Sequence, residues 1–385
     1  MELSSLVAAM EARLPAILAD TEELVKCESP SADLEAVARS ADIVAAVGAR
    51  HLGSAAERIV IDGRTHLRWR LGEGPARVLL LCHHDTVWPL GSLETHPYTV
   101  SDGVMRGPGC VDMKAGIVLG LHALAQLGVP GGVTLLVTGD EEIGSPSSRA
   151  LIETEAAGCS AALVLESAAN DGALKTERKG VSLYQVRAVG RAAHAGLEPE
   201  RGVNATVELA HQVLAVAGFG DQERGTSVTP TALSSGTTSN TVPAVGSFAV
   251  DVRMWDGAEQ ARVDAAMRSL LPVVPDAVLQ VSGGPNRAPL SAAASAELFE
   301  RAGGLAVLLG LAPRTGAAVG GASDGNFTAG VGTPTLDGLG AAGGGAHADD
   351  EHVRVAELPG RAALIAALIS DLLDGAPAGS PGGTG

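Results

Sequence analysis

Basic residues are scarce in this sequence. Its 385 residues include 27 Lys and Arg against 44 Asp and Glu, which gives a formal net charge of −17. Because phosphate backbones and anionic membrane surfaces attract cationic proteins, this imbalance argues against a nucleic acid or a membrane as partner. Bound cations could neutralise some of the carboxylates, although a solvated acidic surface accounts for most of them.

Aromatic residues, cysteines and long apolar runs are also rare. With 2% aromatic residues in a chain that is 46% hydrophobic, we expect a core of Val, Leu, Ile and Ala. The cysteines have no CxxC spacing and are too few for a disulfide scaffold, so we predict reduced thiols at Cys27, Cys82, Cys110 and Cys159. No apolar stretch is long enough to span a bilayer, and the acidic N-terminal segment is unlike a signal peptide. Together these features favour a cytoplasmic protein.

Short apolar runs predict the fold class. Between Arg77 and Glu166 the runs VLLLCHH, VTLLVTGDEE and ALVLES alternate with helical patterns, which is typical of α/β units on a mostly parallel sheet. In the middle of the chain, longer strands of alternating polarity and two helices, one across Asn204–Phe219, predict an α+β module with an antiparallel sheet. After Pro289 the alternation of short apolar runs with helical patterns resumes, as expected for a return to the α/β domain.

The chain length suits two domains or one domain with an insertion. We predict an α/β domain formed by residues 1–179 and 288–374, with residues 180–287 inserted as the α+β module. The tail 375–385, GAPAGSPGGTG, has no apolar side chain that could anchor it, so we expect it to be disordered.

Candidate metal ligands follow the apolar runs, at the strand ends where functional loops of parallel sheets lie. His83 directly follows a strand, and Asp85, two residues on, could orient its imidazole. Asp112 lies between a Gly/Pro turn and a helix, where its oxygens could bridge two cations. Taken singly, a pair of strand-end histidines without a ligand and an N-capping aspartate explain these segments equally well or better.

Two adjacent carboxylates, Glu141 and Glu142 in TGDEEIGS, would repel each other unless a cation or a proton separates their roles. The pair suits one metal ligand and one general base acting on water, with a solvated acidic turn as the alternative. Glu166 ends another apolar run, and His347 lies in the glycine-rich segment GGGAHADDEHV. Together these nitrogen and oxygen donors suit two Zn²⁺ ions, with Co²⁺ or Mn²⁺ as substitutes.

Eight motifs in this order resemble the dinuclear zinc exopeptidase and aminoacylase family, which includes bacterial glutamate carboxypeptidase. They cover nearly the whole chain and are HHDTV, GPGCVDMKAG, TGDEEIGS, LVLES, GRAAHAG, SNTVPA, VDVR and GGGAHADDEHV. The resemblance implies a zinc ion held by His83 and Glu166, another held by Glu142 and His347, and a bridging carboxylate at Asp112.

The resemblance also assigns roles around the metals. Asp85 would orient His83, Glu141 would be the general base, and a cis peptide would join Asp112 to Met113. The nearest glutamate carboxypeptidases have a second aspartate where this chain has Met113. This difference weakens only the narrowest assignment.

The inserted module resembles a lid and dimerisation domain. The resemblance implies a homodimer in which His194 reaches the partner's site as an oxyanion donor, and substrate contacts from Asn240 and Arg253. From the residues alone, Arg253 could instead pair with Asp251 or Asp256, and Asn204 is better explained as a helix cap.

The implied reaction is hydrolysis of the amide bond of a C-terminal amino acid, with glutamate favoured. Deacylation of another N-acyl amino acid, as by acetylornithine deacetylase, and dipeptide cleavage are the alternatives. Lys175, Arg178 and Lys179 could attract an acidic side chain or form only a solvated hinge.

Two protein classes outside the hydrolases are alternatives. The glycines of Gly338–Gly343 match a dinucleotide fingerprint, but no helix is expected to follow, which argues against a nicotinamide-dependent oxidoreductase. A metal-stabilised binding protein without catalysis would have no need of Glu141.

Overall fold

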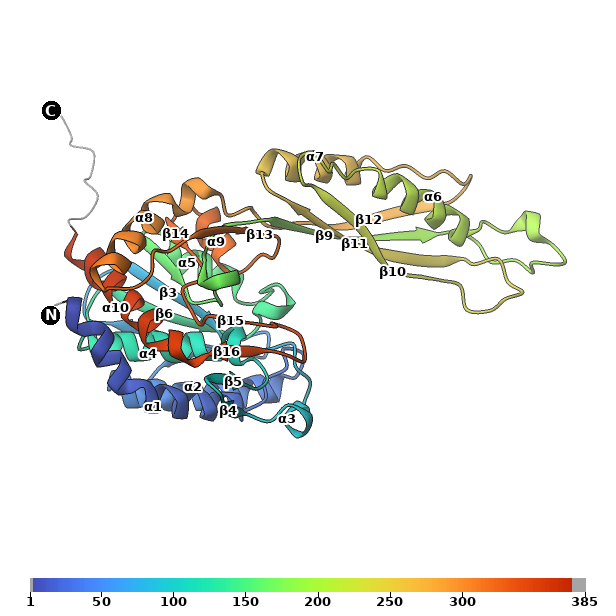
Figure 1. Ribbon diagram of the computed structural model, residues 1–385. Helices are drawn as coiled ribbons and strands as arrows, with labels where there is room; N and C mark the ends of the chain where they lie inside the picture. Colours follow the sequence, from blue (N-terminus) through green and yellow to red (C-terminus); the bar gives the residue numbers. More distant parts are fainter. Residues whose placement is uncertain (1–2, 376–385) are drawn as a thin grey trace, which may run out of the picture. The chain divides into compact units, whose positions relative to one another are not determined.

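The computed structural model describes residues 3–375, so all but the first residue of the predicted tail lies outside the described residues. The chain forms two compact units. The first contains the residues up to Glu177, Leu290–Val319 and those from Ser323 onward, and the second contains Arg178–Pro289 and Gly320–Ala322. Most elements of both are labelled in Figure 1.

A six-stranded sheet forms the centre of the first unit. Its order is β1 (Glu57–Ile61), β2 (Arg64–Leu71), β6 (Val133–Thr138), β3 (Val78–His83), β7 (Ala161–Val164) and β14 (Thr335–Leu336). The pairings among β6, β3, β7 and β14 are parallel, and those of β1 with β2 and of β2 with β6 are antiparallel. The mostly parallel α/β sheet predicted from the sequence is therefore confirmed.

Both faces of this sheet are buried. Val78, Leu80 and Cys82 of β3 belong to the larger hydrophobic core, whereas Leu79 and Leu81 belong to the smaller core on the opposite face. Because each face needs apolar side chains, the strands read as continuous apolar runs rather than as alternating ones.

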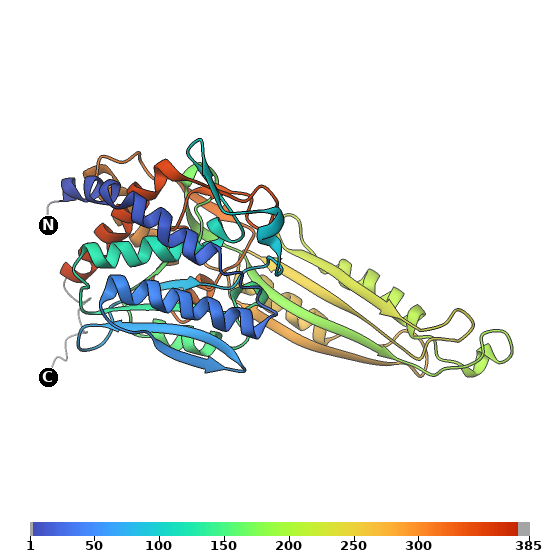
Figure 2. The ribbon, with the colours of Figure 1, turned by 90° about the horizontal axis from the view of Figure 1, so that it is seen from below.

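Helices cover the two cores. The larger core contains residues of α1 (Leu6–Val25), α2 (Leu34–Leu52), α4 (Ala115–Gln126), α8 (Ala292–Leu308) and α10 (Leu358–Asp374), and the smaller core those of α5 (Arg149–Ala156) and α9 (Gly325–Gly330). Among them α1, α2 and α4 contact one another and lie side by side in Figure 2. Helix α2 begins at Asp33, whose carboxylate accepts the main-chain N–H groups of Glu35 and Ala36, and ends at the left-handed Gly53.

Smaller elements complete the first unit. They are a sheet of order β15 (Gly343–Gly344), β16 (His352–Arg354), β5 (Val104–Arg106) and β4 (Thr99–Ser101), the pair β13 (Gly316–Val319) and β8 (Leu174–Arg178), and the short helix α3 (Ser92–Thr95). No helix follows the glycines of Gly338–Gly343, so the context of a dinucleotide fingerprint is missing, as expected.

The second unit is the predicted α+β module. Its antiparallel sheet has the order β10 (Ser227–Ser235), β11 (Val245–Met254), β9 (Gly180–Val189) and β12 (Val278–Arg287). The helices α6 (Ala205–Ala217) and α7 (Gly257–Arg268) pack on it over a core that includes Val186, Phe248 and Val250. Asn204 caps α6 by accepting the N–H groups of Thr206 and Val207, as predicted.

Two predictions from composition can be compared with the structure. All four cysteines are free, in agreement with the predicted thiols. Among residues 3–375, no helix combines the length and the apolar character needed to cross a membrane.

Candidate metal centre

The candidate ligands gather at the carboxyl ends of neighbouring parallel strands. His83 is the last residue of β3, and Glu166 follows the end of β7 by two residues. Glu141 and Glu142 lie in a 3₁₀ turn, Glu141–Ile143, just after β6. Because these strands are adjacent and parallel, their ends meet at one edge of the sheet.

Asp112 stands between two sets of donors. Its Oδ1 lies 3.1 Å from Nε2 of His83, and its Oδ2 lies 3.5 Å from Nε2 of His347. The same nitrogen of His83 is 3.4 Å from Oε1 of Glu166, and that of His347 is 3.0 Å from Oε2 of Glu142. Each oxygen of Asp112 therefore serves a different imidazole, which is the arrangement of a bridging carboxylate. The peptide from Asp112 to Met113 is cis, as the family resemblance implies.

The carboxylates raise the pKa of both imidazoles. Burial lowers the pKa of His83, but hydrogen bonds with Asp112, Asp85 and Glu166 outweigh it and raise the pKa well above its ordinary value. Hydrogen bonds with Asp112 and Glu142 raise the pKa of His347 to about 10. Conversely, although burial raises the pKa of Asp112, hydrogen bonds from His347 and His83 make the net change a decrease. The cluster thus holds more negative charge than its own side chains balance, which favours bound cations.

The geometry of single atoms also fits metal ions. Oε1 of Glu142 is buried and has no hydrogen-bond partner among the described residues, so a lone pair is left for a ligand. His83 places Nδ1 3.0 Å from the main-chain oxygen of Asp85, where Nδ1 donates its proton and leaves Nε2 to bind. Two imidazoles with several carboxylates form a donor set suited to zinc and related ions.

Asp85 is completely buried and contacts more than His83. Its Oδ1 lies 3.5 Å from Nδ1 of His83 and accepts the main-chain N–H of Glu141 at 3.2 Å. Its Oδ2 accepts the N–H of Glu142 at 3.2 Å and the hydroxyl of Ser31 at 2.6 Å. One carboxylate therefore orients the imidazole and fixes the turn that carries both glutamates.

The second histidine of HHD has a different environment. Nε2 of His84 faces the main-chain oxygen of Thr65 at 3.0 Å, and burial lowers the pKa of His84 to about 4. Its ring is a neutral, buried contact between strands.

Glu351 is a functional candidate that the sequence did not reveal. It is buried, and its carboxylate accepts the N–H groups of Gly109, Val111 and Asp112 at 2.8–3.2 Å and the indole N–H of Trp88 at 2.6 Å. Glu351 lies four residues after His347, so one loop carries a candidate ligand and also holds the turn of Asp112. The adjacent acidic residues of HADDE could have drawn attention to Glu351, but nothing in the sequence indicates that it contacts the distant turn of Asp112.

The remaining predicted residues lie in the second unit. His194 accepts the N–H groups of Gly196 and Leu197 at Nδ1, at 3.1 and 3.2 Å, so in the neutral ring the proton is on Nε2. Arg253 donates from Nε and Nη2 to the two oxygens of Asp251 at 2.8 and 2.9 Å, which is one of the pairings considered from the sequence. Asn240 is exposed, and its main-chain oxygen accepts the N–H of Ala195.

Comparisons with known proteins reveal related sequences and structures. Residues 79–371 match the model of peptidase family M20/M25/M40. The chain is 32% identical over 382 residues to carboxypeptidase G2 from Pseudomonas sp. (strain RS-16), an alignment that covers 93% of this chain and 89% of that protein. A shorter match, 42% identical over 74 residues, covers 18% of this chain and 19% of succinyl-diaminopimelate desuccinylase from Anaplasma marginale (strain Florida).

Solved structures share the fold. The chain is similar to an M20 family metallo-carboxypeptidase from Sulfolobus solfataricus with a TM-score of 0.70 and 16% identity. This similarity extends over 92% of this chain and 98% of the other.

Replacing Glu351 by Gln should weaken metal binding by roughly 10–100-fold, because an amide offers one accepting atom and turns an N–H₂ group toward main-chain donors. Affinity can be measured by competition with a chelator of known strength. Asp349→Asn is the matched control, since Asp349 is on the same loop with its side chain 92% exposed. Equal affinity of Glu351→Gln and the wild type would show that Glu351 does not position Asp112.

Proposed function

Because the chain belongs to peptidase family M20/M25/M40 and is a metal-dependent hydrolase, we propose that it cleaves the amide bond between a C-terminal glutamate and an acyl or peptidyl group. The observation that carries the proposal is the position of Asp112, with one oxygen toward His83 and the other toward His347. The similarity to carboxypeptidase G2 over most of both chains supports a free C-terminal carboxylate in the substrate.

In the proposed centre, His83 and Glu166 would hold one metal, Glu142 and His347 would hold the other, and Asp112 would serve both. We propose Zn²⁺ as the metal, with Co²⁺ or Mn²⁺ as substitutes. When bound, such ions polarise the carbonyl of the amide and lower the pKa of water.

Glu141 is the proposed general base. It takes a proton from the attacking water and delivers it to the leaving nitrogen. Its position suits this role, because its main-chain N–H is fixed by Asp85 and its carboxylate lies within 4.8 Å of donor atoms of His83 and Glu166. The two adjacent glutamates then have separate tasks, since Glu142 faces His347.

His194 is the proposed donor to the oxyanion of the tetrahedral intermediate. Two main-chain N–H groups occupy its Nδ1, so Nε2 of this exposed residue carries the donor N–H in the neutral ring. Arg253 keeps donors that its pair with Asp251 does not use, and with Asn240 it would hold the substrate carboxylate.

A homodimer through the second unit is part of the proposal. Strand β10 is an edge of its sheet, and the neighbouring helix α6 packs against it. Leu214 on α6 is 75% exposed, and Val207 on α6 and Leu233 on β10 are also exposed. Exposed apolar side chains beside an open sheet edge suit a second copy of the chain.

Among the three basic residues considered for substrate charge, Lys175 is the best placed. Its amine donates to the hydroxyl of Ser167 at 3.4 Å. Its positive charge contributes to the lowered pKa of Asp112, behind the hydrogen bonds from His347 and His83. Arg178 and Lys179 donate to the main-chain oxygens of Gly321 and Gly225. We therefore assign Lys175 to the side-chain carboxylate of glutamate.

Deacylation of another N-acyl amino acid is the second candidate. The observation in its favour is the 74-residue match to a desuccinylase. It would use the same proposed metal ligands and the same base.

Glu141→Gln should reduce kcat by roughly 10²–10⁴-fold on N-acyl-glutamates while the metal content stays unchanged, because the amide cannot accept the proton from water. Activity is measured by release of glutamate and metal by mass spectrometry. Glu300→Gln, at an exposed helix position, should behave as the wild type. A Glu141→Gln enzyme with more than a tenth of the wild-type kcat would refute the assignment.

Lys175→Met should lower the preference for C-terminal glutamate over glutamine by roughly tenfold or more, since one charge pair is lost. The ratio of kcat/KM for two matched N-acyl substrates measures this preference and cancels any general effect on the metals. Lys179→Met is the control, since its amine is engaged 2.5 Å from the oxygen of Gly225. An unchanged ratio would remove Lys175 from the specificity site.

Mixing the inactive variants Glu141→Gln and His194→Ala should restore activity. If His194 acts on the partner's site, each mixed dimer has one complete site, so random assembly recovers about one quarter of wild-type activity. Subunits carrying different affinity tags allow mixed dimers to be isolated before the assay. Mixed dimers without activity would show that His194 does not act across a dimer.

A further inference from the structure

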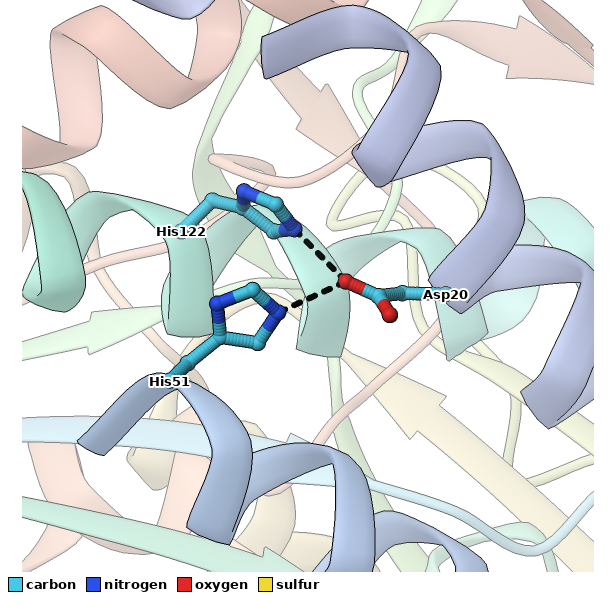
Figure 3. A group of neighbouring side chains, drawn as sticks. All are labelled: Asp20, His51 and His122. Atoms are coloured by element: carbon cyan, nitrogen blue, oxygen red, sulfur yellow. Dashed lines mark hydrogen bonds and ion pairs between the residues drawn. The ribbon is translucent and has the colours of Figure 1, made fainter. Parts of the chain in front are cut away.

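A second group of metal-ligating side chains lies in the first unit, outside the centre described above. Asp20 is on α1, His51 is at the end of α2, and His122 is on α4. Figure 3 shows both imidazoles turned toward one oxygen of Asp20. We propose that these three residues bind an additional divalent transition metal ion of the zinc type.

The donor atoms converge closely. Oδ2 of Asp20 lies 2.7 Å from Nε2 of His51 and 2.8 Å from Nε2 of His122. The ring centroids of the two histidines are 4.2 Å apart, and one donor atom from each residue falls within 4.8 Å of the others. Three ligands brought together from three helices can surround one small ion.

The other oxygen of the carboxylate is held by a cation. Nη2 of Arg50 donates to Oδ1 of Asp20 at 3.0 Å and to Oε2 of Glu23 at 2.6 Å. This contact fixes the carboxylate with Oδ2 toward the histidines, and Glu23 balances the charge of Arg50. In metal sites, hydrogen bonds to the oxygen that does not bind the metal orient the ligating carboxylate in the same way.

Burial keeps two of the donors in the form that binds metal. Burial lowers the pKa of the fully buried His122, against the effect of Asp20, so its ring is neutral at physiological pH. Burial raises the pKa of Asp20, but hydrogen bonds from His122, His51 and Arg50 outweigh this effect and lower the pKa below its ordinary value, so the carboxylate is ionised. Neutral imidazole and carboxylate are the ligand forms.

The donor set selects the class of ion. Two imidazole nitrogens and one carboxylate oxygen suit Zn²⁺, Co²⁺, Ni²⁺ or Cu²⁺, whereas Mg²⁺ and Ca²⁺ prefer oxygen ligands alone. A bound ion would join α1, α2 and α4, which contact one another. The role of the site would therefore be to stabilise the packing of these helices. This role is independent of the proposed catalytic reaction.

Metal binding can be tested without the catalytic centre. In the full-length triple variant His83→Gln, Asp112→Asn, Glu142→Gln, both proposed metal positions of the catalytic centre lose ligands and the second group is intact. Titration of the metal-free protein with Co²⁺, followed by visible absorption and by equilibrium dialysis, should show about one bound ion per chain. Bound Co²⁺ should also raise the melting temperature of this variant. Adding the substitution His51→Gln to the same variant should abolish both the absorption and the rise in melting temperature.

Two further variants complete the test. His211→Gln in the same background is the control, because His211 is exposed on α6 of the other unit, and it should bind Co²⁺ as the background does. Asp20→Asn, which keeps the side-chain shape, replaces His51→Gln if circular dichroism shows that the latter does not fold. The proposal would be wrong if the background protein binds no Co²⁺, or binds it equally after His51→Gln or Asp20→Asn. Asp20, His51 and His122 would then form only a hydrogen-bonded contact between helices.

Discussion

Repulsion among carboxylates gathered at one edge of the sheet is the constraint on which the candidate centre depends. Asp85, Asp112, Glu142 and Glu166 all lie near His83 or His347, most of them buried. Such a group is stable only if positive charge enters it and if each carboxylate is held in place. The raised pKa of both histidines is the first response to this constraint, because a protonated imidazole supplies charge where a metal ion would.

The second response is a set of buried acids that accept main-chain N–H groups. Asp85 holds the turn of Glu141 and Glu142, Glu351 holds the turn of Asp112, and Asp140 accepts both the N–H and the hydroxyl groups of Ser147 and Ser148. The contacts of Asp85 and Glu351 join loops that are far apart in the sequence, and those of Asp140 fix a turn within one loop. They act like the outer shell of a metal site, which fixes ligands that loops alone would leave mobile.

Much of the fold, and the grouping of the candidate ligands, could be predicted because local signals agree with the tertiary structure. The apolar runs became β3, β6 and β7, and the helix predicted across Asn204–Phe219 is observed at Ala205–Ala217. Arg253 and Asp251 are two apart on β11 and so share a face, which is why their pairing could be considered in advance. The contacts of Glu351 and the meeting of Asp20 with His122 depend on helices and loops more than 100 residues apart, so no local pattern reveals them.

The two halves of the candidate centre differ in their access to water. The side chain of His83 is 2% exposed, whereas that of His347 is 51% exposed, on a residue with φ of 65° in a glycine-rich loop. A non-glycine residue in that conformation costs roughly 1–3 kcal/mol, so the loop can relax once its contacts are released. In the proposed centre, an ion beside His83 would be enclosed by the sheet, and an ion beside His347 would face a loop that can open. The two positions would therefore differ in how readily a bound ion exchanges with solvent.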